Sequence, residues 1–236
     1  QSSVHRLFPC VIAGIAIAAS VWIVPLRAGH AEWKQDLNTD WKLMRDEHGI
    51  RSFRALVSGS HRLAFKAEAV VDRGIERVLS VVLDDDRMGE WVPRIAESRR
   101  LRWIDEPCEF LQLARFDAPW PVSDRVFLSR IVLSVNARTR RTELRYFDVD
   151  EAVSTGAAIQ GFAGGSYYIF EPLSGGRQTR VTAVAVVDPR GFIPSWLINW
   201  IGKSMAHDTM IRLREQVNRP DVFDLPVVKR IYDVDH

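Results

Sequence analysis

The stretch VVDPRGFIPSWLINWIG, residues 186–202, joins a predicted strand to a predicted long helix and decides the fold. Large apolar side chains crowd this junction, at Phe192, Ile193, Trp196, Leu197, Ile198, Trp200 and Ile201. A helix that covers one face of a sheet needs only a single apolar stripe. The density therefore predicts either the cover of a protein core or a surface that meets an apolar molecule other than protein.

The helix continues well beyond the junction. Helical spacing holds over residues 194–217, with an apolar stripe at Ile198, Ile201, Met205, Thr209 and Leu213. Pro194 suits the first turn, where a helix has no use for the missing N–H group. The pattern predicts one long helix near the C-terminus that packs across a sheet.

Six strands are predicted upstream of this helix, because short runs that alternate or are apolar lie between turn signals. The runs are SRRLRWIDEP (98–107), CEFLQLARFD (108–117), RVFLSRIVLSVN (125–136), TELRYFDVDE (142–151), SYYIFEPL (166–173) and QTRVTAVAVVD (178–188). Their close spacing favours one antiparallel, strongly curved sheet. The small-residue loop 152–165 is too long for a hairpin, and loops of this kind usually bind something or move.

Three further elements are predicted ahead of these strands. The first is a helix over residues 33–48 that ends at His48-Gly49, since Trp33, Leu37, Trp41 and Met44 share a helical stripe. A hairpin follows over residues 50–71. The third is a second helix with Asp72 as its cap and Ile75, Val78, Leu79 and Val82 at helical spacing. This order of elements predicts an α+β fold, with the last helix on the concave face of the sheet.

The N-terminus differs from the rest of the 236-residue chain, whose composition suits one globular domain. Residues 7–26 carry no charge, and the small residues Gly29 and Ala31 follow them, which predicts a signal peptide cut after Ala31. An uncleaved membrane anchor is the alternative, because the uncharged run approaches the length of a membrane span. Either way we expect an exported, periplasmic protein, released by cleavage or held at the inner membrane by residues 1–31.

The charge balance argues against a nucleic-acid partner. Removing residues 1–31 takes away Arg6 and Arg27 from 32 basic residues and no acidic residue, which leaves 30 of each sign. Binding to phosphates requires a basic face that displaces counterions, and no run of Lys or Arg supplies one.

Three stretches resemble the START (steroidogenic acute regulatory protein-related lipid transfer) domain family in its bacterial form. They are DWKLMRDEHGIRSFR (40–54), APWPVSDRVFLSR (118–130) and IFEPLSGGRQTRVTAVAVVDPRGFIPSWLIN (169–199). The resemblance implies a helix-grip fold, in which a curved antiparallel sheet wraps around a long C-terminal helix and encloses an apolar tunnel for one lipid. It implies a lipid-binding domain over residues 32–220, a C-terminal tail over 221–236, and a gate formed by the loop 152–165 and the start of the last helix.

The resemblance and the distribution of large side chains together indicate which residues line the tunnel or its mouth. These candidates are Trp91, Gln112, Phe116, Trp120, Phe162, Tyr167, Trp196 and Met205. Steroid-carrying members of the family hold a buried acid and arginine where this chain has Gln112 and Ile131. We therefore expect an acyl lipid or phospholipid in preference to a sterol. We also expect transient contact with a membrane. Arg125 is expected in a buried polar network, with Asp124 as its partner.

Sequence patterns for catalysis are weak, and we predict no catalytic residue, cofactor or metal site. The chain has no nucleophile elbow or phosphate-binding glycine motif, and its histidines lack metal-ligand spacing. Two alternatives to lipid transfer stay open. One is an enzyme of the aromatase/cyclase type that shares this architecture, with His207-Asp208 as its acid/base pair; the other is a membrane-anchored interaction module with a collapsed tunnel.

Overall fold

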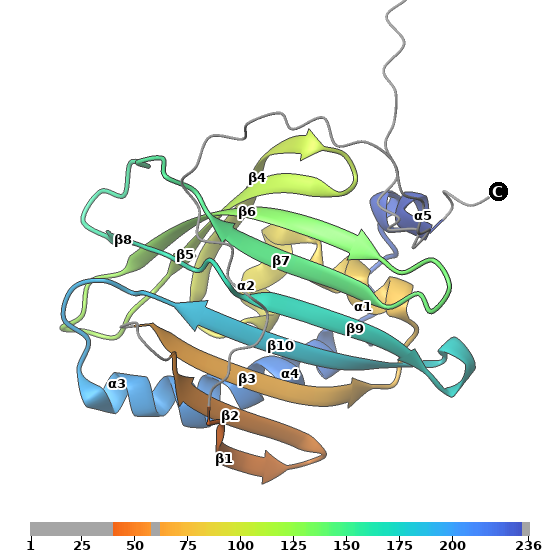
Figure 1. Cartoon of the computed structure of the whole chain (residues 1–236), viewed down its shortest axis with the longest axis horizontal. Helices are drawn as coiled ribbons and strands as arrows, with labels where there is room; N and C mark the ends of the chain where they lie inside the picture. The colour runs from red at the N-terminus through yellow and green to blue at the C-terminus, as the bar shows by residue number, and fades with distance from the viewer. Residues whose placement is uncertain (1–39, 58–61, 233–236) are drawn as a thin grey trace, which may run out of the picture.

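The computed structural model describes residues 40–57 and 62–232, which form one curved ten-stranded sheet with helices against its concave face (Figure 1). The predicted N-terminal segment 1–31 lies outside the described residues. Within the described part of the chain, no helix combines the length and the hydropathy that a membrane span requires.

Neighbouring strands pair in the order β1-β2-β3-β10-β9-β7-β6-β5-β4. Their bounds are β1 Lys42–Glu47, β2 Ile50–Leu56, β3 Leu63–Val71, β4 Ile95–Asp105, β5 Glu109–Phe116, β6 Arg125–Val135, β7 Thr142–Asp148, β8 Ile159–Gly161, β9 Tyr167–Leu173 and β10 Gln178–Val187. All pairs along this path are antiparallel, and β8 pairs in parallel with the first residues of β6. The six strands predicted over residues 98–188 and the hairpin β2–β3 are confirmed, whereas β8 lies within the loop that was expected to be irregular.

Helices fill the space on the concave side. They are α1 Ile75–Val82, α2 Met88–Trp91, α3 Ser195–Trp200, α4 Ala206–Gln216 and α5 Pro226–Tyr232, with a 3-10 turn at Asp85–Arg87 before α2 and another at Ser174–Gly176. A π-helical segment, Ile201–Met205, joins α3 to α4, so the three form the long last helix that the spacing predicts. The α+β class and the helix-grip arrangement are thereby confirmed.

The helix predicted over residues 33–48 is wrong for its described part. Residues Lys42–Glu47 form strand β1, which pairs with β2 across the two-residue turn at His48-Gly49. Both turn residues have positive φ angles, 55° and 66°, the conformation of a tight hairpin turn. His48-Gly49 was interpreted as a helix stop because a helix end also favours positive φ. Trp33 and Leu37 lie outside the described residues.

The main core lies between the sheet and these helices. Its largest buried side chains include Trp91, Phe110 and Phe170, and α5 adds Val228 and Ile231. Hence the region beyond Pro220, whose sequence pattern is too weak for a prediction, contributes a helix to the core. The cap predicted at Asp72 is also wrong: Gly74 is the N-cap residue of α1, and Asp72 instead accepts a hydrogen bond from Gln178 (2.6 Å).

Candidate functional site

Between the sheet and the last helix lies an apolar cavity in two adjoining halves, of about 200 and about 160 Å³. The inner half is bounded by strands β3, β5, β6, β7, β9 and β10, by the last helix, and by Met88 of α2 with Val92 and Ile95 after it. The outer half lies nearer α3. The halves share Phe65, Ile95, Phe127, Ala185, Val187, Ile201 and Met205 as lining residues. Strand alternation explains this wall, because inward-facing residues recur every second position.

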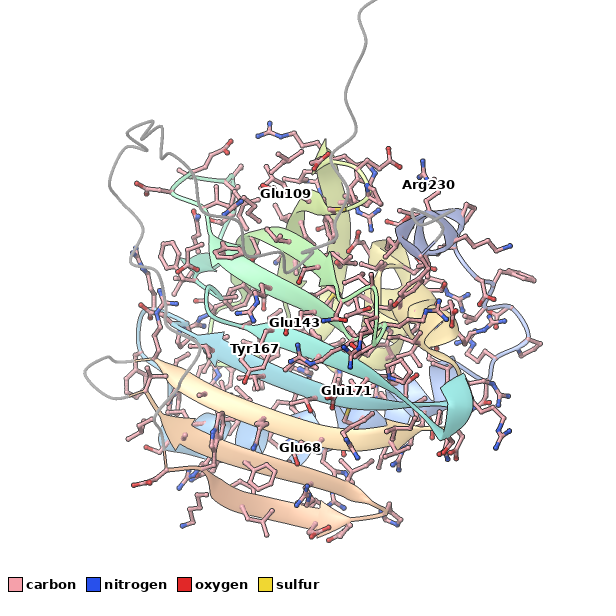
Figure 2. All side chains as sticks on the ribbon, turned by 45° about the vertical axis from the view of Figure 1, so that its right-hand side comes forward. Glu68, Glu109, Glu143, Tyr167, Glu171 and Arg230 are labelled. Atoms are coloured by element: carbon pink, nitrogen blue, oxygen red, sulfur yellow. The ribbon has the colours of Figure 1, made fainter. Side chains whose placement is uncertain are left out.

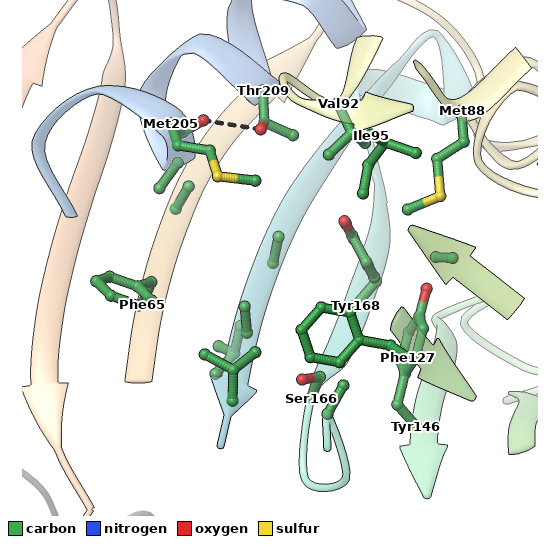
Figure 3. A pocket seen from close by; sticks show the side chains of 18 of the residues that line it. Phe65, Met88, Val92, Ile95, Phe127, Tyr146, Ser166, Tyr168, Met205 and Thr209 are labelled. Carbon is green, nitrogen blue, oxygen red and sulfur yellow. Dashed lines mark hydrogen bonds between the residues drawn. The ribbon is translucent and has the colours of Figure 1, made fainter. Parts of the chain in front are cut away.

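Two tyrosines line the inner half. Tyr146 on β7 and Tyr168 on β9 lie close together, with ring centroids 6.3 Å apart (Figure 3). Burial raises the pKa of both phenols, that of Tyr168 to about 12. Both therefore stay protonated at neutral pH and offer O–H groups next to an otherwise apolar space.

A buried polar cluster lies behind the wall of the inner half. Gln112 lines the cavity, and its Nε2 donates a hydrogen bond to Oδ1 of Asp85. Arg100 Nη2 lies 2.7 Å from Asp85 Oδ2 and also donates to the Leu83 carbonyl. Burial raises the pKa of Asp85, opposed by the charge of Arg100. The cluster is thus an ion pair without net charge that presents Gln112 to the cavity.

The acid and arginine of steroid-carrying members are absent at Gln112 and Ile131, as the sequence indicates. Asp85 and Arg100 form an acid–arginine pair from other positions, behind Gln112 and outside both cavity linings. Asp85 lies in the turn before α2 and Arg100 on β4. Ile131, by contrast, belongs to the hydrophobic core.

The last helix changes from α-helical to π-helical hydrogen bonding where it lines the cavity. Ile201 and Met205 lie at the two ends of the π-helical segment, and both line both halves. One turn further on, the Thr209 hydroxyl donates to the Met205 carbonyl (2.8 Å), which satisfies a polar group inside the cavity wall (Figure 3). Single π-helical turns inside α-helices often mark functional sites.

The outer half is bounded by the segment that links β5 to β6 and by the segment that leads into α3. Arg125 is 2% exposed and ties the two together, because it donates to the carbonyls of Ser123, Pro189 (3.1 Å) and Arg190 (3.1 Å). The predicted buried role of Arg125 is confirmed. Asp124 is not its hydrogen-bond partner, since the Asp124 carboxylate accepts from Arg115 (2.6 Å), which lowers the Asp124 pKa.

Three of the eight predicted ligand-contacting residues line the cavity. Gln112 lines the inner half, Phe116 the outer half, and Met205 both. Gln112 and Phe116 come from the same face of β5, whereas Met205 reaches the cavity from the last helix. Met205 lies on the helical stripe that the sequence predicts, whereas Gln112 and Phe116 were named from the family resemblance and the distribution of large side chains.

The other five lie outside both linings. Trp91 is 1% exposed and packs in the core, while Trp120 and Trp196 are exposed at the surface. Phe162 pairs with Asp188 in an isolated bridge and lies under the Arg190 guanidinium. Tyr167 projects from the outer face of the sheet, near Glu143 and Glu68 (Figure 2).

Several lining residues escaped the sequence analysis, above all Tyr146, Tyr168 and Phe127. Tyr168 is the immediate neighbour of Tyr167, and strand alternation places the two on opposite faces. Pairing register identifies the inward face: Gln112 is opposite Ser129, and Tyr168 is opposite Ala183, all four of them in the cavity wall. The pairing register of the strands therefore identifies these lining residues, and the sequence alone does not supply it.

Comparisons with known proteins agree with this architecture. The structure is similar to the human StarD13 (DLC2) lipid transfer and protein localization domain, with TM-score 0.64 and 18% identity over 79% of this chain and 92% of the other. It is similar to a STAR-related lipid transfer protein fragment from Xanthomonas axonopodis, with TM-score 0.61 and 22% identity over 76% of this chain and 99% of the other. At these identities the likeness shows the fold alone.

In sequence, the chain is 27% identical to an uncharacterized protein of Pseudomonas aeruginosa over 86% of this chain and 95% of that protein. The family model of the START domain matches residues 26–221, most of the chain and every element that bounds the cavity. This chain therefore belongs to the START domain family.

Proposed function

We propose that this domain binds one lipid or similar apolar molecule in the cavity and carries or presents it. The observation that supports the proposal most directly is the two-part apolar cavity between the sheet and the last helix. Membership of the START domain family supports lipid binding in general. Transfer from one location to another is the further step that the proposal adds.

Burial of apolar surface would drive binding. At about 25 cal/mol per Å², a few hundred Å² of hydrocarbon removed from water gives several kcal/mol without any ionic contact. The two phenols and Gln112 supply hydrogen-bonding groups for one uncharged polar end of the ligand. Specificity would come from these few polar groups and affinity from the rest of the wall.

We propose an acyl lipid or phospholipid in preference to a sterol. The two halves of the cavity meet at the side chains of Phe127 and Met205, which line both. A flexible chain can pass between such side chains at lower cost than a rigid fused ring. Phenolic O–H groups also suit the carbonyl oxygen of an ester or a protonated acid.

Ligand exchange would take place at the outer half, in transient contact with a membrane. Trp120, Phe192 and Trp196 are 91%, 82% and 51% exposed. Trp120 and Phe192 lie on the two segments that Arg125 ties together, and Trp196 lies in the first turn of α3. Tryptophan favours the boundary between apolar and aqueous regions of a bilayer. The start of the last helix and the loop 152–165 would move to open the path.

The proposed role is not enzymatic. An acid or base must titrate near the working pH to transfer protons well. Among the described residues, the cavity-lining phenols have raised pKa values and the lining guanidinium is that of Arg125. His207, the acid/base candidate of the enzyme alternative, is buried but lies outside both linings.

Native mass spectrometry of the protein, purified without detergent from a lipid-containing host, tests this function. We expect one lipid per chain, lost in Met205→Trp and retained in Met44→Trp, a matched change on strand β1 outside the cavity wall. The added mass separates acyl lipids from sterols. A protein that stays free of ligand when fatty acids, phospholipids and sterols are offered rejects the proposal and favours the interaction module.

We further propose that residues 1–31 direct export to the periplasm or anchor the domain at the inner membrane. The uncharged run over residues 7–26 and the small residues before Glu32 support this. Cell fractionation, with mass spectrometry of the N-terminus, tests it: cleavage after Ala31 indicates a signal peptide, and an intact membrane-bound chain indicates an anchor. Recovery in the cytosol contradicts both.

A further inference from the structure

The turn of the β1–β2 hairpin meets the first turn of α4 at a group of potential metal ligands. Glu47, His48 and His207 each offer one ligand atom, and these atoms all lie within 4.8 Å of one another. The group lies outside both cavity linings. It joins residues far apart in the sequence, so spacing alone could not reveal it, and the sequence analysis predicted no metal site.

The geometry of His207 is compatible with metal binding through Nδ1. Its side chain is fully buried, its Nε2 lies 3.3 Å from the Glu47 carbonyl oxygen, and its Nδ1 has no hydrogen-bond partner. A proton on Nε2 that is donated to this carbonyl leaves the lone pair on Nδ1. Metal-bound histidines commonly donate their second nitrogen to a backbone carbonyl in this way, which fixes the tautomer.

Glu47 keeps one carboxylate oxygen available. Arg45 donates both Nε (3.0 Å) and Nη2 (2.7 Å) to the same atom, Oε2, which leaves Oε1 without a bond from Arg45. The Arg45 guanidinium also lies 3.8 Å from Asp208 Oδ1. This guanidinium therefore competes with any cation that approaches the group.

His48 supplies the third ligand from an exposed position in the hairpin turn. Its ring centroid lies 6.2 Å from that of His207. An exposed side chain can change rotamer at low cost, so its nitrogen can approach a shared ion. Two histidines and one glutamate, with water in the fourth position, form a known ligand set for zinc.

We propose that Glu47, His48 and His207 bind one divalent transition-metal ion, Zn²⁺ or a similar ion that accepts nitrogen and oxygen ligands. The ion ties the β1–β2 hairpin to the start of α4, directly after the π-helical segment. Asp208 Oδ1, 3.6 Å from His207 Nδ1, adds negative charge beside the ion. The inference stands apart from the proposed lipid binding, because no residue of the group lines the cavity.

Calorimetric titration of the EDTA-treated protein with Zn²⁺ tests the site. We expect one equivalent bound per chain and an affinity at least about tenfold lower in His48→Asn, His207→Gln and Glu47→Gln. Asn tolerates the positive φ of His48, and Gln at 207 can still donate to the Glu47 carbonyl. Asp46→Asn, next to the group on β1, is the matched control and should bind as the unaltered chain does.

Arg45→Ala should change the affinity for Zn²⁺ in the opposite direction, which separates metal binding from a structural role. Removing the competing guanidinium should tighten Zn²⁺ binding, whereas loss of a merely structural contact would not. Zn²⁺ at about 100 times Kd should also raise the Tm of the unaltered chain by about 5–10 °C, and that of His48→Asn far less. If His207→Gln fails to fold, the Zn²⁺ affinity of His48→Asn, a change at an exposed residue, tests the site instead. Unchanged affinity in His48→Asn and Glu47→Gln, or weaker binding in Arg45→Ala, overturns the proposal.

Discussion

The Gln112 side-chain amide donates a hydrogen bond to the Asp85 carboxylate at the wall of the cavity, where both side chains are about 95% buried. Arg100 contacts the other carboxylate oxygen and stacks on Trp103 and Phe110. Burial of a carboxylate raises the free energy of the folded state unless both oxygens have partners. Gln112 therefore stabilises the Asp85 carboxylate as well as lining the cavity.

Replacing Gln112 by Met should therefore destabilise the fold by about 1–3 kcal/mol, because Asp85 loses a donor that water cannot replace. Gln178→Met is the matched control, since Gln178 donates to Asp72 at an exposed position, and we expect less than about 0.5 kcal/mol there. Urea unfolding of both variants measures the difference. Equal losses would mean that water reaches Asp85.

A second prediction concerns pH. Glu90 on α2 accepts two hydrogen bonds from Arg87, one from Gln216 at the end of α4 and one from Arg219. Arg87 foremost, and then Gln216, lower the pKa of Glu90 to about 2 from an ordinary value of 4.5. Because the folded-state pKa is depressed, this stabilisation is complete above pH 4.5 and is lost as the pH falls towards 2.

Unfolding free energies measured between pH 7 and pH 2 test this. The difference between the unaltered chain and Glu90→Gln should be largest above pH 4.5 and should vanish near pH 2. Glu97→Gln, in an exposed pair with Arg99 on β4, is the control and should show little difference at any pH. A difference for Glu90→Gln that is constant with pH would assign its effect to packing.

A third prediction concerns the end of the loop 152–165. The Gly164 N–H donates to Asp148 (2.6 Å), while Arg62 contacts both the Gly164 carbonyl and Asp148. A Cβ at Gly164 would lie 2.8 Å from the Asp148 backbone nitrogen, too close for any side chain. Gly164→Ala should thus cost about 1–3 kcal/mol, since β7 and the loop must separate.

Gly156→Asn is the control for this change. Gly156 lies in the same loop with φ of 60° and has nothing within 4 Å of its Cβ position, and Asn tolerates that conformation. We expect a change below about 0.5 kcal/mol there. Thermal unfolding compares the two variants, and similar Tm values would show that the loop is not anchored through Gly164.

Alternation and helical spacing were sufficient to predict the six central strands and the last helix, because each has one buried face. They failed at Lys42–Glu47, an edge strand whose two faces are both largely accessible, so its apolar spacing carried little information. β8 was missed for a related reason: three residues are too few to show a period.

The candidate site could be predicted only in part. Met205 lies on the predicted helical stripe, and Phe116 was named as a large apolar side chain of a predicted strand. Choosing Tyr168 instead of Tyr167 requires the strand register, since a shift of one residue exchanges the two faces. The Asp85–Arg100 pair could not be foreseen, because it joins a turn to a strand through tertiary packing alone.

The last prediction concerns the exposed aromatic residues beside the outer half of the cavity. If Trp120 and Phe192 enter a membrane surface during exchange, replacing either by Ser should weaken binding to phospholipid vesicles by about tenfold, since each buries an aromatic ring worth at least about 1.4 kcal/mol. Phe223→Ser is the matched control: Phe223 is 74% exposed but precedes α5, away from α3 in Figure 1. Vesicle co-sedimentation measures the three variants, with circular dichroism to confirm folding. Equal retention of Trp120→Ser, Phe192→Ser and Phe223→Ser would place the membrane contact elsewhere and require another route into the cavity.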